Sequence, residues 1–261
     1  MRTYSTVLLS LLSLLVVAPL AACDSSNGNG ADGGNGDDDA DASLPLDGDG
    51  SVITPQCGQL IAELRDFRAD HPDFENGNQD DRGLVKDDLG ADGLPVYKPA
   101  GATPTVSGAD SFNQWYRDVP GVNMTFLVPL TLLETPAGSG TYVYDDPDFF
   151  PLDGKGWPNE EVMGHNFHFT THIHGTFLYR GGEVFAFRGD DDVWVFVNGK
   201  LALDLGGVHG VESGSIDFDA KAGQLGISTG NVYTLDVFHA ERHTSASNFR
   251  VETSIDCLVV E

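Results

Sequence analysis

Basic residues are scarce in this chain. It contains 14 Lys and Arg against 40 Asp and Glu, which gives a formal net charge of −26 at pH 7. So acidic a protein repels the phosphate backbone of nucleic acids and the headgroups of anionic lipids. The composition therefore predicts no nucleic-acid partner. It leaves cations, neutral glycans or basic proteins as binding partners.

Long apolar runs are missing after residue 22, so no later segment is long enough to span a membrane. The one apolar stretch, Val7 to Leu20, follows the positive charge of Arg2 and is typical of an export signal over residues 1–22. Leu-Ala-Ala-Cys at its end resembles a bacterial lipobox, which implies a lipid on the Cys23 thiol. The predicted location is then the outer membrane or cell surface, and retention at the inner membrane is the alternative location. The alternative to a lipobox is an ordinary signal peptide that is cleaved elsewhere.

Cysteine is also rare, with three residues in the whole chain. If Cys23 carries a lipid, Cys57 and Cys257 remain, near the two ends of the rest of the chain. In an exported protein such a pair is expected to form a disulfide. Two free buried thiols are the alternative.

Residues 23–56 have almost nothing that a fold could bury. They are rich in Gly, Asn and Asp and contain no Lys or Arg, so we expect a disordered acidic tether. Residues 57–261 have a globular composition. About two hundred residues are enough for one substantial core, and we find no internal repeat.

Helical patterns are few in residues 57–261. Leu60–Phe67 fits a helix or a strand, with the strand slightly favoured, residues 71–108 are predicted to form loops, and Asp110-Ser111 suits the start of a short helix. Alternating apolar patterns predict strands over residues 122–133, 141–145, 165–180, 183–188, 193–197, 200–205, 215–219, 231–239 and 248–257. The predicted fold is an all-β antiparallel sandwich with long loops and one or two short helices.

Three adjacent carboxylates, Asp190, Asp191 and Asp192, precede the apolar strand 193–197. Neighbouring like charges repel unless water or a cation screens them. Because Ca²⁺ prefers carboxylate oxygens, a calcium site is predicted here. Asn248 or Asp204 is the candidate for a further ligand. A solvated acidic turn is the alternative.

Four histidines crowd the preceding segment: His165, His168, His172 and His174. His-x-His is a spacing found in zinc and copper sites, and a strand would place the last three on one face. One strand cannot complete a tetrahedral site, so a structural role is the favoured interpretation.

Other candidates are weaker. Gly206 to Gly210 suits a tight loop beside the acidic run, which makes His209 a candidate ligand-binding residue, and Glu241-Arg242-His243 suits an ion-paired corner. Of the aromatic residues considered for stacking on sugar rings (Trp115, Tyr116, Trp157 and Trp194), Trp157 between Gly156 and Pro158 is the best candidate, and Trp194 is expected in the core.

Several motifs resemble the fibro-slime domain family, in order over residues 60–257: Arg65–Phe67 with His71–Glu75, Phe112–Asp118, His165–Thr171, Gly189–Lys200 with Asp204–His209, and Ala240–His243 with Ser247–Arg250. Residues 190–200 are also similar to the wider superfamily of protective-antigen-type β-sandwich domains, which includes yeast flocculins and adhesins. In its sugar-binding members, two consecutive Asp residues joined by a cis peptide hold Ca²⁺, which ligates sugar hydroxyls. Their spacing to the Asn-Gly turn implies Asp190 and Asp191 here, with Asp192 replacing a usually small or neutral residue.

These observations predict a lipid-anchored surface module for Ca²⁺-dependent carbohydrate binding and adhesion, without enzymatic activity. The alternative is a structural component of an extracellular matrix or slime that binds Ca²⁺ only for stability. A hydrolase that uses the histidine segment is a distant third. The sequence indicates no oligomeric state.

Overall fold

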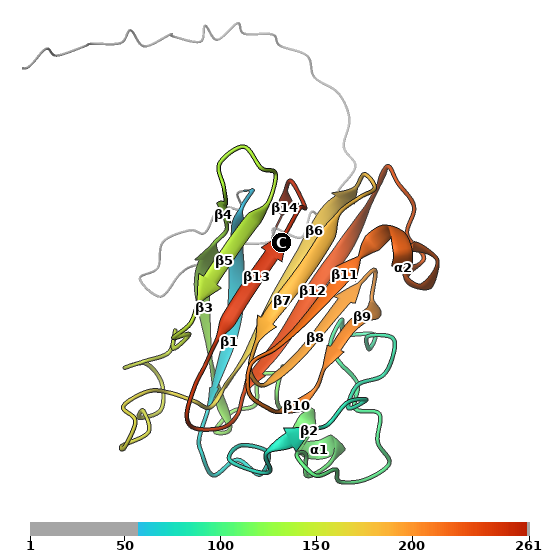
Figure 1. Ribbon diagram of the computed structural model, residues 1–261. Coiled ribbons are helices and arrows are strands. Elements are labelled where there is room, and N and C mark those ends of the chain that lie inside the picture. The colour runs from blue at the N-terminus through green and yellow to red at the C-terminus, as the bar shows by residue number, and fades with distance from the viewer. Residues whose placement is uncertain (1–56, 260–261) are drawn as a thin grey trace, which may run out of the picture. The chain divides into compact units, whose positions relative to one another are not determined.

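The computed structural model describes residues 57–259, and most of their regular structure is β-strand. Two antiparallel sheets pack face to face (Figure 1). The predicted all-β antiparallel sandwich is therefore confirmed. The export signal, the lipid at Cys23 and the tether lie outside the described residues.

The larger sheet has seven strands, all paired antiparallel. Across the sheet they are β3 (Asn123–Thr131), β1 (Gln59–Phe67), β6 (Phe169–Tyr179), β12 (Asn231–Glu241), β8 (Asp192–Val197) and β9 (Lys200–Leu205), with β14 (Leu258–Val259) added beside β6. The ambiguous segment Leu60–Phe67 is thus a strand, as favoured.

The smaller sheet has five strands: β11 (Glu212–Asp217), β7 (Val184–Gly189), β13 (Phe249–Thr253), β5 (Tyr142–Asp146) and β4 (Leu133–Glu134). A separate pair joins β10 (Gly207–Val208) to β2 (Gln79–Asp80). Two helices complete the described structure, α1 (Ala109–Phe112) and α2 (Phe218–Leu225). Apart from β2 and two isolated bridges, residues 71–108 are loop, as predicted.

The main core lies between the two sheets. Alternate residues of each strand point into it, as the two-residue period of a strand requires. Ile173 and Phe177 of β6 meet Phe187 of β7 and Val251 of β13 there, each almost fully buried.

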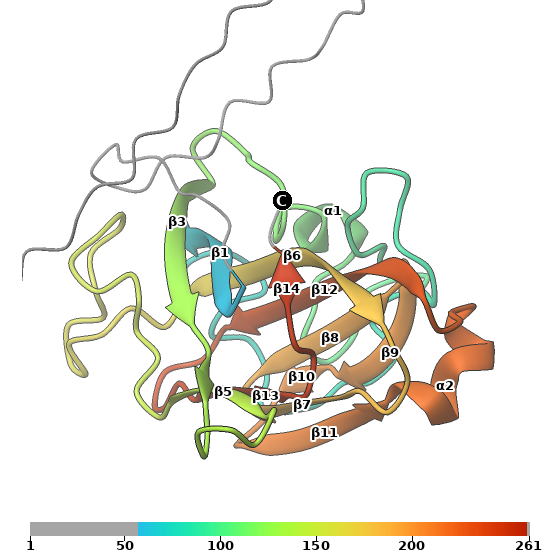
Figure 2. The same ribbon diagram turned by 90° about the horizontal axis from the view of Figure 1, so that it is seen from above.

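A second apolar cluster lies on the outer face of the larger sheet. Trp194, Phe196 and Phe238 project outward and are covered by Phe112 and Trp115, which belong to the loop-rich segment around α1. Figure 2 shows this segment as a third layer, on the side of the larger sheet away from the smaller one. Both faces of β8 are therefore buried, which explains why this strand is apolar at consecutive positions.

The Asn198-Gly199 turn connects β8 to β9 directly, with Val197 paired to Lys200. Asn198 and Gly199 have φ of 52° and 68°. Positive φ at both central residues is what a type I′ hairpin requires, and Asn-Gly provides it at low cost.

Several strands differ from the sequence prediction. The stretch 122–133 divides into β3 and β4, which belong to different sheets, and the strand expected over 248–257 ends at Thr253. The strand expected over residues 215–219 ends at Asp217, whose side chain accepts a hydrogen bond from Ala220 N at 2.9 Å and begins α2. Gly226 ends the helix in the left-handed conformation. Asp217 and Gly226 are ordinary helix start and stop signals, and they outweigh the alternation that predicts a strand here. The strand expected from residue 165 begins only at Phe169, because Asp153 and Asn166 hydrogen-bond the backbone of residues 166 and 168.

The Cys57–Cys257 disulfide is present, as predicted. It connects the residues just before β1 and β14. Over residues 57–259 there is no helix of the length and apolar character needed to cross a membrane.

Replacing Cys57 and Cys257 by Ser should lower the free energy of unfolding by about 2–5 kcal/mol, because the bridge restrains a long loop in the unfolded chain. Urea denaturation followed by tryptophan fluorescence measures this change. Cys23→Ser is the matched control, because it replaces a cysteine that takes no part in the bridge. Equal midpoints for the double variant and the control would contradict the prediction.

Candidate functional site

Three connections between strands meet at one end of the sandwich. Asp190 and Asp191 link β7 in the smaller sheet to β8 in the larger one, residues 242–248 link β12 to β13, and residues 209–211 link β10 to β11. Strand register brings their ends together, since Gly189 pairs with both Glu212 and Phe249, and Asp192 pairs with Ala240. The acidic run therefore lies where the chain crosses from the smaller sheet to the larger one.

Asp190 is 5 % exposed, and groups from β12 and from the loop before β13 hold it. Its carboxylate accepts hydrogen bonds from Asn248 N at 2.5 Å and from Asn248 Nδ2 at 3.2 Å. Its backbone carbonyl accepts one from Nε2 of His239 at 2.9 Å. Burial lowers the pKa of His239 to about 4, so this imidazole is neutral at pH 7.

Asp191 is 4 % exposed and accepts hydrogen bonds from the backbone N–H of His209 at 3.1 Å and of Arg242 at 3.0 Å. Burial raises the pKa of Asp191 to about 7; the charge of Asp192 adds to this effect, and Arg242 opposes it. Near neutral pH this carboxyl therefore exchanges readily between a protonated and an ionised form.

Asp192 has a different environment. Its Oδ2 accepts from Nε of Arg242 at 2.6 Å, and both side chains are completely buried. Its Oδ1 accepts from Gly207 N at 2.7 Å. Because its charge is paired with the buried guanidinium of Arg242, Asp192 has a different role from its two neighbours.

Glu241, at the end of β12, is completely buried beside the acidic run. Within residues 57–259, no hydrogen bond of normal geometry reaches either oxygen of its carboxyl group. Burial raises the pKa of Glu241 well above its usual value, repulsion from Asp191 and Asp190 raises it further, and Ser247 and the backbone of His243 oppose the shift. A buried polar group without a partner is costly, so this position favours either a proton or a cation.

The pocket over these groups has a volume of about 100 Å³ and is lined by Asp190, Asp191, His209 and His243, with Asn78 and small residues of the surrounding loops. Both ring nitrogens of His209 lie against carbonyl oxygens, of Leu205 at 3.0 Å and of Gly210 at 2.9 Å. Burial lowers the pKa of His209, but these carbonyls outweigh it and the net shift is upward. The pocket thus combines two carboxyls with a histidine that is easily protonated.

Some of the remaining predicted site residues lie at the acidic run, and others lie elsewhere. His209 and Asn248 lie at the acidic run as expected, whereas Asp204 accepts from the indole Nε1 of Trp194 at 3.0 Å instead. Trp157 is half-buried, with the guanidinium of Arg68 over its ring at 3.8 Å, and does not line the pocket. Trp194 is in the core as predicted, and Trp115 and Tyr116 are buried too and cannot stack on a ligand.

The peptide bond between Asp190 and Asp191 differs from the geometry that the resemblance implied. Among the described residues the cis peptide bond is Thr135–Pro136, and the Asp190–Asp191 bond is trans. The two carboxylates are nevertheless buried and held by the protein, so a solvated acidic turn is not what the structure contains.

Glu241 was missed as a member of this site. The sequence suggests only a charged corner at this position. The pattern along the strand puts Glu241 on the face opposite to Phe238 and Ala240, but it does not show which connection lies against it. The available signal in the sequence was a glutamate at the end of a mostly apolar strand, because such a position is more often buried than an ordinary glutamate.

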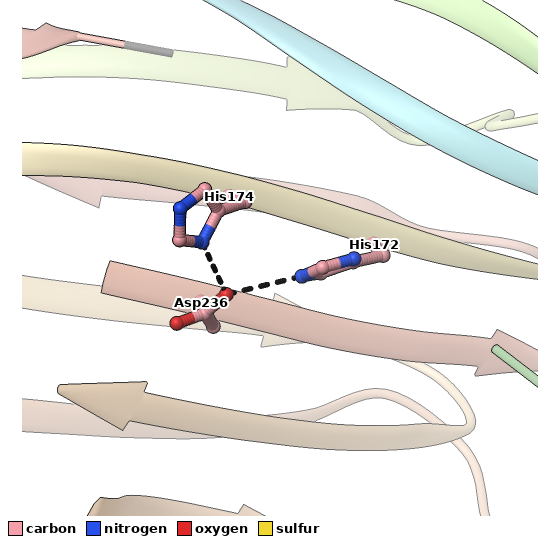
Figure 3. Close-up of side chains that lie close together, drawn as sticks. All are labelled: His172, His174 and Asp236. Carbon is pink, nitrogen blue, oxygen red and sulfur yellow. Dashed lines mark hydrogen bonds and ion pairs between the residues drawn. The ribbon is translucent and has the colours of Figure 1, made fainter. Parts of the chain in front are cut away.

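A second polar cluster lies on the outer face of the larger sheet. Asp236 Oδ1 is 3.1 Å from His172 Nε2 and 2.6 Å from His174 Nδ1 (Figure 3). The other two histidines of the segment are elsewhere: His165 pairs with Asp153 and His168 with Glu75. Of the three histidines predicted to share one face of a strand, His172 and His174 lie in β6, whereas His168 lies just before the strand begins.

The chain belongs to the PA14 domain family, whose model matches residues 120–258. This agrees with the similarity to protective-antigen-type sandwiches. The closer resemblance to fibro-slime domains stays a prediction.

Curated relatives of this chain include several proteins of Dictyostelium discoideum. Protein psiQ is 41 % identical over 187 residues, which are 67 % of this chain and 18 % of psiQ. Protein psiD is 42 % identical over 187 residues, or 36 % of its length, and protein psiC is 35 % identical over 209 residues, or 40 % of its length. The chain thus spans less than half the length of these relatives.

Similar solved structures include a PA14 sugar-binding domain from an RTX adhesin, with a TM-score of 0.31 and 8 % identity over 76 % of this chain and 90 % of that domain. Another is the PA14 domain of the MpAFP antifreeze protein, with a TM-score of 0.32 and 10 % identity over 80 % of this chain and 91 % of that domain.

Arg242→Met should destabilise the protein by about 3–5 kcal/mol, because it leaves the carboxylate of Asp192 buried without its counter-charge. Adding Asp192→Asn to this variant should recover part of the loss. Chemical denaturation of both variants measures the two values. Lys98→Met is the control, since it removes an exposed ion pair with Asp87 and should cost less than about 1 kcal/mol. Similar losses for Arg242→Met and Lys98→Met would refute a central role for the buried pair.

The raised pKa of Asp191 predicts a pH dependence in metal-free protein. The folded pKa of about 7 lies above the usual 3.8, so the unfolded chain loses its proton first. Stability should therefore fall as pH rises from about 4 to 7, by an amount on the order of 2–4 kcal/mol.

Thermal melts in EDTA across this pH range test the prediction. Asp191→Asn should flatten the fall relative to the wild type, whereas Asp110→Asn, at an exposed position of α1, should leave it unchanged. A wild-type slope that survives Asp191→Asn would show that Asp191 is not its source.

Proposed function

We propose that this domain is a non-catalytic module for Ca²⁺-dependent carbohydrate binding, displayed at the cell surface through a lipid on Cys23. The observation that carries the proposal is the burial of the Glu241 carboxyl, which accepts no hydrogen bond of normal geometry, close to the carboxyls of Asp190 and Asp191. Membership of the PA14 domain family is consistent with it.

Calcium is the cation that suits these groups. Ca²⁺ takes six to eight oxygen ligands, and carboxylates are its preferred ones. A bound dication would favour the ionised forms of Asp191 and Glu241, whose pKa values burial now raises. It would also supply a counter-charge for the carboxyl of Glu241. We assign Asp190, Asp191 and Glu241 as ligands, with Asn248 orienting Asp190 and Asp192 holding Arg242.

A neutral sugar suits the mouth of the pocket. With a volume of about 100 Å³ the pocket holds an ion and a few oxygen atoms rather than a whole saccharide. Neighbouring hydroxyl groups of a sugar could therefore complete the coordination of Ca²⁺ from outside. The net charge of −26 disfavours anionic polymers as ligands, so a neutral glycan is the expected partner.

The predicted tether gives this site access to its ligand. A flexible chain of the length of residues 23–56 has an r.m.s. reach of roughly 30 Å. A domain joined to a lipid through such a segment stands away from the membrane and can contact a neighbouring cell or a matrix, which is what adhesion requires.

Calcium should raise the melting temperature of EDTA-treated protein and be required for binding to a glycan array. Asp190→Asn and Glu241→Gln should abolish both effects, because each removes a charged ligand. Asp110→Asn is the matched control and should behave like the wild type. Thermal melts and the array, each with and without CaCl₂, are the measurements.

Two outcomes would contradict the proposal in different ways. Calcium stabilisation without any sugar signal would favour a structural component of a matrix that uses Ca²⁺ only for rigidity. An unchanged melting temperature in CaCl₂ would exclude the calcium site itself.

A further inference from the structure

The histidine cluster is separate from the acidic pocket. His172 and His174 lie on β6 and Asp236 on β12, and the register pairs Asp236 directly with His174 and Phe238 with His172. All three side chains project from the outer face of the larger sheet, whereas the acidic pocket lies in the connections at the end of the sandwich. Figure 3 shows both imidazoles directed at the carboxylate of Asp236.

The ligand atoms have the spacing of a metal site. One nitrogen from each histidine and one carboxylate oxygen all lie within 4.8 Å of one another. Zinc binds imidazole nitrogen and carboxylate oxygen at about 2.0–2.2 Å, so two ligands of a tetrahedral ion lie about 3.3 Å apart. The distances from Asp236 Oδ1, 3.1 Å to His172 and 2.6 Å to His174, need only small side-chain rotations to match.

The surroundings hold two of the ligands in place. The His172 ring stacks on Phe238, with 4.2 Å between centroids and 13° between planes, and its other nitrogen, Nδ1, faces Glu63 at 3.9 Å. A carboxylate behind a histidine is the usual outer-shell partner in zinc sites. The carboxylate of Asp236 is only 4 % exposed; burial raises its pKa, but hydrogen bonds from both histidines outweigh this and keep the pKa below its usual value.

Solvent reaches the cluster from one side. The side chain of His174 is 36 % exposed, against 12 % for His172. An ion held by three protein ligands at such a place keeps its remaining position open to water.

We propose that His172 Nε2, His174 Nδ1 and the carboxylate of Asp236 bind one zinc-class divalent ion, with its fourth position open to solvent. Two imidazole ligands favour Zn²⁺ over Ca²⁺, which prefers oxygen. This site is distinct from the proposed calcium site and does not depend on it. It differs from the structural role favoured for these histidines on sequence alone, because the second strand supplies the carboxylate that one strand lacks.

Isothermal titration of the full chain, free of affinity tag and of metal, with ZnCl₂ in excess CaCl₂ tests the proposal. We expect one ion per chain. Glu63→Gln removes an outer-shell partner and should weaken zinc binding by roughly 10–100-fold. His174→Ala removes a ligand and should weaken binding by at least that much. His165→Ala is the matched control, since that histidine is also partly exposed and paired with an aspartate, and it should leave the affinity unchanged.

Cobalt gives a second readout that does not depend on affinity. Co²⁺-loaded wild-type protein should show the visible absorption of a site with nitrogen ligands, and His174→Ala should remove it while its circular dichroism spectrum stays that of the wild type. Zinc binding should survive Asp190→Asn, which removes the proposed calcium ligand. Absence of saturable zinc binding, equal affinities for His174→Ala and His165→Ala, or loss of zinc binding in Asp190→Asn would each overturn the proposal.

Discussion

The buried ion pair between Arg242 and Asp192 connects more of this structure than any other contact that we describe. Nη1 of Arg242 donates to the carbonyl oxygens of Asp73 and Thr105, at 3.0 and 2.7 Å, and its guanidinium lies over the ring of Trp115 at 4.6 Å. One side chain therefore joins β8, the loop after β12 and the outer loop layer. Since a buried charge needs its partner, these three parts hold one another in position.

This constraint also explains the arrangement of the acidic run. With Asp192 committed to Arg242, the chain turns so that Asp190 and Asp191 face the loops after β10 and β12, where backbone N–H groups hold them. Three adjacent carboxylates thus divide into one that stabilises the fold and two that line a pocket. Glu241, on the neighbouring strand, adds a third buried carboxyl beside these two, although it does not line the pocket. A proton or a cation would balance the charge of these three groups.

Much of the fold was predictable because local patterns agreed with it. The alternation in β6, β12 and β13, the Asn198-Gly199 turn and the pairing of Cys57 with Cys257 are each encoded by neighbouring residues or by counting. Helix α2 was not predicted, although Asp217 and Gly226 mark its ends, because its apolar residues are too few to show a helical period. The acidic group at Asp190 and the histidine group on β6 were only partly predictable. Glu241 and Asp236, which complete them, lie far along the chain from the residues that they face.

The sequence by itself determined an acidic, all-β chain with one disulfide, a hairpin after the apolar strand and a concentration of carboxylates before it, because these depend on composition and on spacing along one strand. Only the tertiary structure decided which carboxylate pairs with Arg242, that Glu241 is buried beside Asp190 and Asp191, and that Asp236 lies against His172 and His174. Those contacts depend on strand register and on which connections meet at one end of the sandwich, and long-range pairing of this kind leaves no local pattern in the sequence.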